Sequence, residues 1–148
     1  MKSLEEMLKI HEGVRLRAYD DATGKTLKAG DTLVGDLTIG IGRNLTSGGL
    51  TQREISSLLK HDIQRATKKA RTYRWFDGLN EVRRAVIVSL IFNMGSIDSF
   101  KKMRSAIAVK DWDVSSAELL DSRYARQVGD RAVALANLLR RGSWLSPR

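Results

Sequence analysis

The sequence predicts an α+β fold, in which a small sheet region near the N-terminus is followed by a larger helical body. In residues 15–42, short runs that suit two or three strands are separated by glycines, and "AGD" (29–31) and "VGD" (34–36) are turn signals. The segment 80–95, "NEVRRAVIVSLIFNMG", is apolar on nearly every side, which is typical of a helix buried all round. With 148 residues, 42% of them apolar, the chain is long enough for a substantial core.

Two capping boxes mark the starts of further helices. "SLEE" at 3–6 opens a helix over 3–12 that Gly13 ends, and "TQRE" at 51–54 opens one that runs to about residue 72. The pattern of apolar residues and stop signals predicts three more helices, over 97–108, 112–120 and 130–141.

The composition excludes several classes of protein. The chain has no cysteine, so disulfides, zinc fingers and thiol nucleophiles are excluded, and its two histidines argue against a histidine-rich metal site. We therefore expect no metal and no cofactor. No stretch approaches the roughly 18 apolar residues of a membrane helix, and "MKSLEEMLKI" has acids where a signal peptide needs an apolar run. These features lead us to expect a protein that accumulates in the cytoplasm in which it is made.

The charge balance points to anionic partners. The chain carries 26 Lys and Arg against 17 Asp and Glu, a formal charge of +9. Such an excess favours nucleic acid, anionic lipid or an acidic cell-wall polymer, and charge alone does not choose among them. For a small, very basic protein, nucleic acid is the first class to consider.

Three acids near the N-terminus are candidates for chemistry. Glu12 continues the row of Leu4 and Leu8, and it lies in the last helical turn, where the helix dipole disfavours an anion and suits a general acid. Asp20 and Asp21 lie in the polar turn "YDDATG", where a carboxylate stays ionised. Two carboxyl groups in contrasting environments are the pattern that cleaves glycosidic bonds. On spacing alone the simpler interpretation, a helix-end acid and two turn formers, is also open.

The stretch "EGVRLRAYDDATG…LTIGIGRNLT" resembles the catalytic region of the phage-type lysozymes, the endolysins of glycoside hydrolase family 24. That family has a Glu, eight residues, an Asp, and a Thr that opens a "TIGIG"-like strand; Glu12, Asp21 and Thr38 match it. The likeness continues through "VRRAVIVSLIFNMG" (82–95), "SRYARQVGDRA" (122–132) and "RRGSW" (140–144). The resemblance implies a two-lobed fold: a sheet lobe over about 13–50, a connecting helix over about 51–72, and a helical lobe over about 73–148 that includes helix 3–12.

The resemblance also implies roles for particular residues. Glu12 would be the general acid that protonates the oxygen between N-acetylmuramic acid and N-acetylglucosamine in peptidoglycan, while Asp21 and Thr38 would hold the attacking water, with inversion at the sugar carbon. Substrate binding would fall to Phe92, Asn93 and Arg131. Gly40 is interpreted as a position where the backbone approaches sugar or must bend.

One spacing departs from the family. Sixteen residues separate Asp21 from Thr38, where the family has about five. Thr26 stands at the shorter spacing from Asp20, but "TLKAG" does not continue into a glycine-alternating strand, whereas "TIGIG" does. We expect residues 25–37 to form a β-hairpin that turns near Ala29–Asp31 and returns Thr38 to face Asp21.

A structural ion pair is also expected. Asp62 falls within the apolar stripe of the 51–72 helix, where a carboxylate needs a cation or donors. In the resembling family a histidine just after the "TIGIG" strand pairs with an Asp on this helix, and Arg43 occupies the matching place here. We therefore expect an Arg43–Asp62 pair.

Two alternatives to the endolysin interpretation are considered: a basic helical module that binds nucleic acid, and a non-catalytic wall-binding relative. The endolysin interpretation implies a monomer that acts on peptidoglycan, binds no nucleic acid and inserts into no membrane. It adsorbs to the anionic wall through its positive charge, and it waits in the host cytoplasm until a separate holin releases it to cause lysis.

Overall fold

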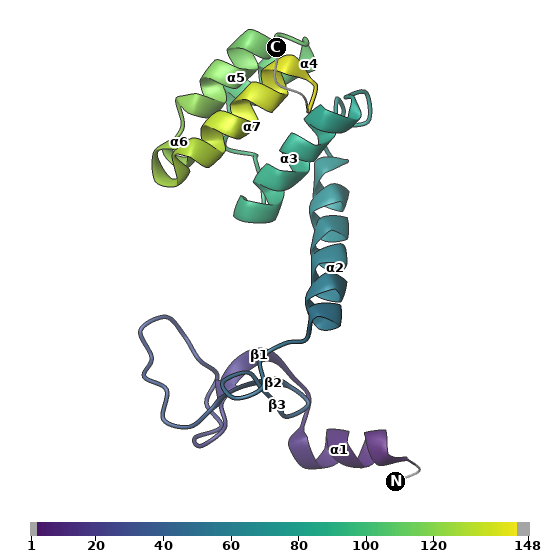
Figure 1. Ribbon diagram of the computed structural model, residues 1–148, viewed down its shortest axis with the longest axis vertical. Helices are drawn as coiled ribbons and strands as arrows, with labels where there is room; N and C mark the ends of the chain where they lie inside the picture. Colours follow the sequence, from purple (N-terminus) through teal and green to yellow (C-terminus); the bar gives the residue numbers. More distant parts are fainter. Residues whose placement is uncertain (1–2, 145–148) are drawn as a thin grey trace. The chain divides into compact units, whose positions relative to one another are not determined.

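The computed structural model describes residues 3–144, and the chain forms two compact units, one ending at Ser56 and the other beginning at Ser57 (Figure 1). The boundary falls inside helix α2 (Gln52–Ala70). The first unit holds a three-stranded antiparallel sheet and the second is helical, which confirms the α+β class. The predicted place of helix 3–12 in the helical lobe depends on how the units sit against each other and stays a prediction. Within the described chain, no helix combines the length and apolar character needed to cross a membrane.

The sheet unit begins with helix α1 (Leu4–Glu12). The Ser3 side chain accepts a hydrogen bond from the Glu6 N–H at 3.1 Å, and Gly13 ends the helix with φ of 74°. Strands β1 (Arg15–Asp20), β2 (Leu37–Gly40) and β3 (Arg43–Asn44) follow, in the order β1-β2-β3. Thr38 on the central strand is paired with Tyr19 on one side and with Asn44 on the other.

The segment 25–37 is not the β-hairpin that we predicted. It turns at the predicted place, because the Asp31 N–H donates to the Lys28 carbonyl at 3.1 Å and the Asp31 carboxylate accepts from the Lys28 N–H at 2.9 Å. Within the described chain, one isolated bridge, between Thr26 and Tyr19, joins the start of the segment to β1, and the segment rejoins the sheet only at its end, where Leu37 begins β2 and pairs with Asp20. The rest is irregular, because backbone N–H groups at 34 and 35 donate to the carboxylate of Asp20 instead of to a neighbouring strand.

All of the helices predicted after residue 50 are present, and the first of them, α2, begins in the first unit. The capping box of α2 is reciprocal, since the Thr51 hydroxyl accepts from the Glu54 N–H at 3.2 Å and the Glu54 carboxylate accepts from the Thr51 N–H at 2.9 Å. Helix α3 (Glu81–Met94) has Asn80 as N-cap and a left-handed Gly95 as C-cap. The remaining helices are α4 (Lys101–Ala108), α5 (Trp112–Leu120), α6 (Arg123–Val128) and α7 (Asp130–Arg141). Helix α6, which Ser122 caps, was not predicted from the sequence.

The core of the helical unit surrounds α3, as its apolar sequence predicts. Ile87 and Leu90 are completely buried. Helix α7 packs against both α3 and α5 (Figure 1), and its buried alanines at 132 and 136 allow close approach of the neighbouring backbones. The buried Ser116 hydroxyl of α5 donates to the Ala136 carbonyl at 2.9 Å, so this polar group is satisfied inside the core.

Arg83 closes the C-terminal end of α7. Its guanidinium donates to the carbonyls of Leu139 at 2.7 Å and Arg140 at 2.8 Å, and it lies 3.8 Å from the ring centroid of Trp112. A cation at this helix end satisfies carbonyls that have no partner within the helix.

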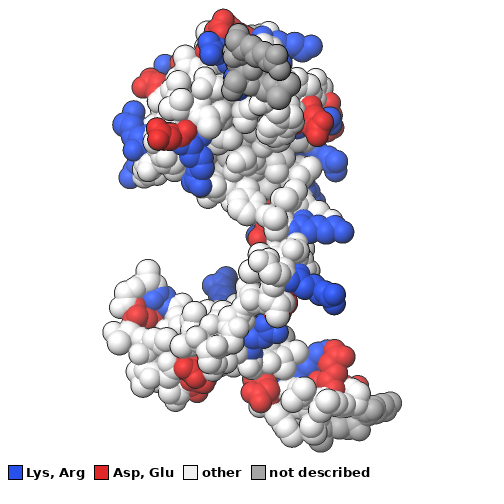
Figure 2. Space-filling model, viewed as in Figure 1, with Lys and Arg blue, Asp and Glu red and all other residues white. Residues whose placement is uncertain are grey.

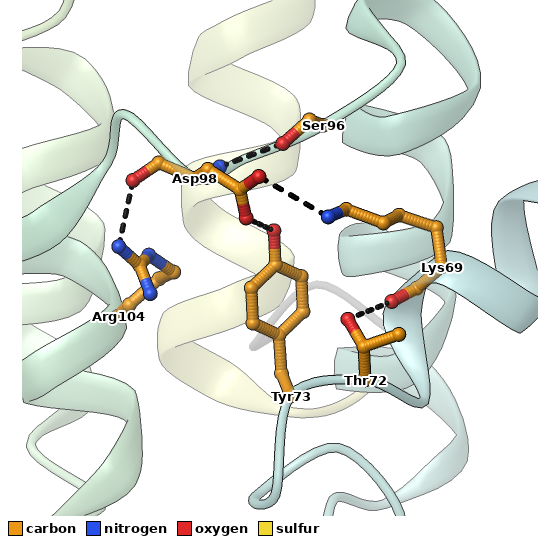
Figure 3. A network of polar contacts seen from close by, with 6 residues as sticks. All are labelled: Lys69, Thr72, Tyr73, Ser96, Asp98 and Arg104. Atoms are coloured by element: carbon orange, nitrogen blue, oxygen red, sulfur yellow. Dashed lines mark hydrogen bonds and ion pairs between the residues drawn. The ribbon is translucent and has the colours of Figure 1, made fainter.

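Asp98 joins the end of α2 to the segment before α4 (Figure 3). Its carboxylate accepts from the Tyr73 hydroxyl at 2.5 Å and from the Lys69 ammonium at 3.1 Å, while its backbone carbonyl accepts from Arg104 at 2.6 Å. The Tyr73 hydroxyl, followed by Ser96 and Lys69, lowers the pKa of Asp98 to about 2. This charged junction therefore stays ionised at neutral pH.

Candidate active site

Glu12 is the last residue of α1, and its carboxyl group lies against the turn between β2 and β3. Gly42 in that turn has φ of 66°, which favours glycine. A Cβ placed on Gly42 would stand 2.9 Å from Oε2 of Glu12 and 3.1 Å from its Cδ. Gly42 is therefore needed both for the turn and for the space that the Glu12 carboxyl group occupies. Gly40, at φ of 70°, would meet nothing within 4 Å, so the bend explains this glycine.

The two neighbouring aspartates at 20 and 21 have different environments. Asp20 is 2% exposed, and its carboxylate accepts from the N–H groups of Val34 at 2.7 Å, Ala22 at 2.9 Å and Gly35 at 3.0 Å. The Val34 N–H makes the largest contribution to holding the pKa of Asp20 below its usual range, and those of Gly35 and Ala22 add to it. Asp21 is exposed and available to a substrate. The geometry therefore gives Asp20 a structural role and leaves Asp21 as the candidate for chemistry.

Asp36 connects Asp21 to Thr38. The Asp36 N–H donates to Oδ1 of Asp21 at 2.7 Å. The Asp36 carbonyl accepts both the Asp21 N–H and the Thr38 hydroxyl, each at 3.1 Å. Thr38 is buried, and the Asp36 side chain accepts from the Asn44 amide at 2.8 Å. Two of the three residues predicted to be catalytic thus share one hydrogen-bonding partner.

Arg43 has a partner within the first unit that the sequence did not indicate. Its guanidinium lies 2.5 Å from Oε2 of Glu54, in the first turn of α2, whereas in the second unit Asp62 lies 4.0 Å from Arg65. The expected Arg43–Asp62 pair would join the two units and stays a prediction. Arg43, followed by the N–H of Thr51, lowers the pKa of Glu54 to about 2.

The substrate-binding residues predicted on the helical unit lie near the end of α3. Asn93 accepts a hydrogen bond from the Arg131 guanidinium at 2.7 Å, which joins α3 to α7. Phe92 is 47% exposed and lines a hollow of about 380 Å³ together with Asp62 and Lys69. Phe92, Asn93 and Arg131 therefore all lie in the helical unit, and their contact with substrate stays a prediction.

Asp36 and Glu54 are partners of the site that the sequence did not indicate. "VGD" at 34–36 predicts only a turn, although Asp36 stands two residues before Thr38 and so shares a strand face with it. Glu54 was predicted only as part of a capping box, and in the structure it completes that box as well. Across residues 3–144, no group of three or more His, Asp or Glu side chains is arranged to hold a metal ion.

Comparison with known proteins defines the class of protein. The sequence matches the family model described as phage lysozyme over residues 9–143, and the chain therefore belongs to the phage lysozyme family. It is a glycoside hydrolase, a lysozyme that hydrolyses peptidoglycan.

Two relatives show where such a domain occurs. The chain is 23% identical to the probable T4-type lysozyme 1 of Dictyostelium discoideum, over 97% of this chain and 96% of that protein. It is 24% identical to the pre-baseplate central spike protein Gp5 of Enterobacteria phage T4, over 95% of this chain but only 28% of that protein. The chain thus matches nearly the full length of one relative and a limited part of a much longer one.

Proposed function

We propose that the enzyme cleaves the β-1,4 bond between N-acetylmuramic acid and N-acetylglucosamine by a single displacement, with Glu12 as general acid and Asp21 and Thr38 as the residues that hold water. The observation that carries this proposal is the shared bonding of Asp21 and Thr38 to Asp36. The Glu12 carboxyl group, held beside Gly42 in the same unit, supports the role of acid.

The hydrogen bonds define which atoms remain for a water molecule. Thr38 uses its hydroxyl proton on the Asp36 carbonyl, so its oxygen can only accept further bonds. Oδ1 of Asp21 already accepts from the Asp36 N–H, which leaves Oδ2 as the second acceptor. A water that donates one proton to each of these oxygens presents its lone pairs to the sugar carbon. It attacks there, Asp21 takes its proton, and Glu12 gives a proton to the departing sugar oxygen.

The binding residues complete this proposal. Asn93 and Arg131 are hydrogen-bonded near the end of α3, and Phe92 precedes Asn93 in the chain. An amide, a guanidinium and an aromatic ring suit the hydroxyl and acetamido groups of the glycan. Lys and Arg side chains lie along the segment labelled α2 in Figure 1 (Figure 2). The sequence of α2 includes Arg53, Lys60 and Lys68, and this positive charge favours adsorption to an anionic wall. In this proposal the enzyme is a monomeric endolysin that a separate holin releases from the host cytoplasm.

The decisive test replaces Glu12 by Gln, which keeps the shape of the side chain but cannot donate the proton. Clearing of outer-membrane-stripped Gram-negative cells should slow by roughly 10²–10⁴-fold, with an unchanged melting temperature. Glu5→Gln on the same helix, where Glu5 bonds only to Lys9 among the described contacts, is the matched control and should clear walls at the parental rate. A Glu12→Gln enzyme as fast as the parent would overturn the proposed mechanism.

Two further measurements test the stereochemistry of the reaction and the route of release. NMR of the newly formed reducing end should show the α anomer first, because a single displacement inverts the β bond. Expressed alone, the chain should stay in the soluble cell fraction without lysing its host, and its release without a holin would contradict the proposed route.

A further inference from the structure

The last residues of the 25–37 segment lie directly against Asp21. A Cβ on Gly35 would collide with Oδ1 of Asp21 and with Ala22, so the Asp21 carboxylate occupies the space that a side chain at 35 would need. The next residue, Asp36, donates its N–H to the same oxygen at 2.7 Å. One wall of the Asp21 site is therefore backbone from the return of this segment.

Asp20 holds that return in place. Its two carboxylate oxygens accept hydrogen bonds from the N–H groups of Val34 and Gly35 on the return and of Ala22, the residue after Asp21. One buried side chain therefore bonds to both backbone segments that adjoin the Asp21 carboxylate. Hydrogen bonds from three N–H groups to one ionised carboxylate are charge-assisted and therefore strong. The negative charge is also well retained, since these donors lower the pKa of Asp20.

We propose that Asp20 is a positioning residue: it fixes the backbone of residues 34–36, and this backbone sets the orientation of the Asp21 carboxylate. The inference rests on the proposed role of Asp21 in holding water. An exposed aspartate otherwise rotates freely about two side-chain bonds, whereas a wall at Gly35 and a donor at Asp36 fix Oδ1 and hence direct Oδ2. The additional residues between Asp21 and Thr38 therefore help to orient the Asp21 carboxylate.

Asp20→Asn is the first test. Asn keeps the size of the side chain but turns one acceptor oxygen into an NH₂ group that faces a backbone N–H. We expect kcat on purified peptidoglycan fragments to fall roughly 10- to 100-fold with KM unchanged, measured well below the melting temperature. Asp31→Asn, at the turn of the same segment, is the matched control and should keep the parental kcat, because Asp31 accepts only from Lys28 among the described contacts.

A second pair of variants separates positioning of Asp21 from general damage to the segment. Gly35→Ala introduces a Cβ that must displace the Asp21 carboxylate and Ala22, while the Asp20 carboxylate itself is retained. Gly30→Ala strains the turn at φ of 86°, yet its Cβ meets nothing within 4 Å. We expect Gly35→Ala to lose kcat as Asp20→Asn does, and Gly30→Ala to keep it.

Asp21→Asn separates a failure of the proposed function from a failure of the positioning role of Asp20. A parental kcat in Asp21→Asn would overturn the proposed function itself. A large loss in Asp21→Asn together with parental kcat in folded Asp20→Asn and Gly35→Ala enzymes would overturn only the positioning role. A change in KM alone, with kcat retained, would likewise contradict it.

Discussion

Gly42→Ala gives a direct test of how closely the Glu12 carboxyl group is held. The new Cβ would stand 2.9 Å from Oε2, 3.1 Å from Cδ and 3.3 Å from Cγ of Glu12. Ordinary contacts between nonbonded carbon atoms are about 3.5–4.0 Å, so the carboxyl group must retreat by roughly 0.5–1 Å. Because Glu12 is a flexible side chain on the end of a helix, it can make this shift without unfolding the sheet unit.

The expected effects on stability and on activity differ in size. Alanine at φ of 66° costs about 1–2 kcal/mol, since a Cβ is disfavoured in left-handed backbone. A displacement of about 1 Å at a group that must reach the sugar oxygen lowers the rate by up to about 10²-fold. Activity should therefore fall far more than the modest loss of stability can explain.

Gly24→Ala supplies the control for strain. Gly24 has φ of 71°, nearly that of Gly42, and a Cβ there meets nothing within 4 Å. Both variants should lose similar stability in thermal unfolding, and only Gly42→Ala should lose the rate of wall clearing. Equal activity in the two variants, or an equal loss in both, would refute the argument that Gly42 makes room for Glu12.

The remaining predictions concern stability. The folded-state pKa of Glu54 is about 2, below its ordinary 4.5, so its pair with Arg43 stabilises the protein fully above about pH 4.5 and this contribution is lost as the pH falls towards 2. Glu54→Gln should flatten the pH dependence of the unfolding free energy over that window and leave its trend between pH 6 and 8 unchanged; an unaltered acid slope would count against the pair. Leu90→Ala should destabilise the protein by about 2–5 kcal/mol in urea unfolding, because Leu90 is completely buried, whereas Leu120→Ala, at 42% exposure, should cost much less. Similar losses for the two leucines would contradict the described core.

Local patterns in the sequence were sufficient for much of this protein. The capping boxes at Ser3 and Thr51, the all-round apolar stretch in α3 and the stop at Gly142 each correspond to an observed helix start, core helix or helix end. These signals act over four residues or within one helix, so they need no knowledge of distant chain segments. Helix α6 was missed because it has only six residues, too few for a periodic pattern.

Sequence patterns were enough to predict the fold class, and the ordered motifs indicated Glu12, Asp21 and Thr38 as candidates. The tertiary structure gave Asp20 and Asp21 different environments, made Asp36 the link between Asp21 and Thr38, paired Arg43 with Glu54, and turned the expected hairpin into a loop. The bonds from Val34 to Asp20, from Asp36 to Asp21 and from Arg43 to Glu54 depend on which donor reaches a given carboxylate across 10 or more residues of chain. Such choices follow from competition among alternative partners in the folded state, and residue spacing does not record them.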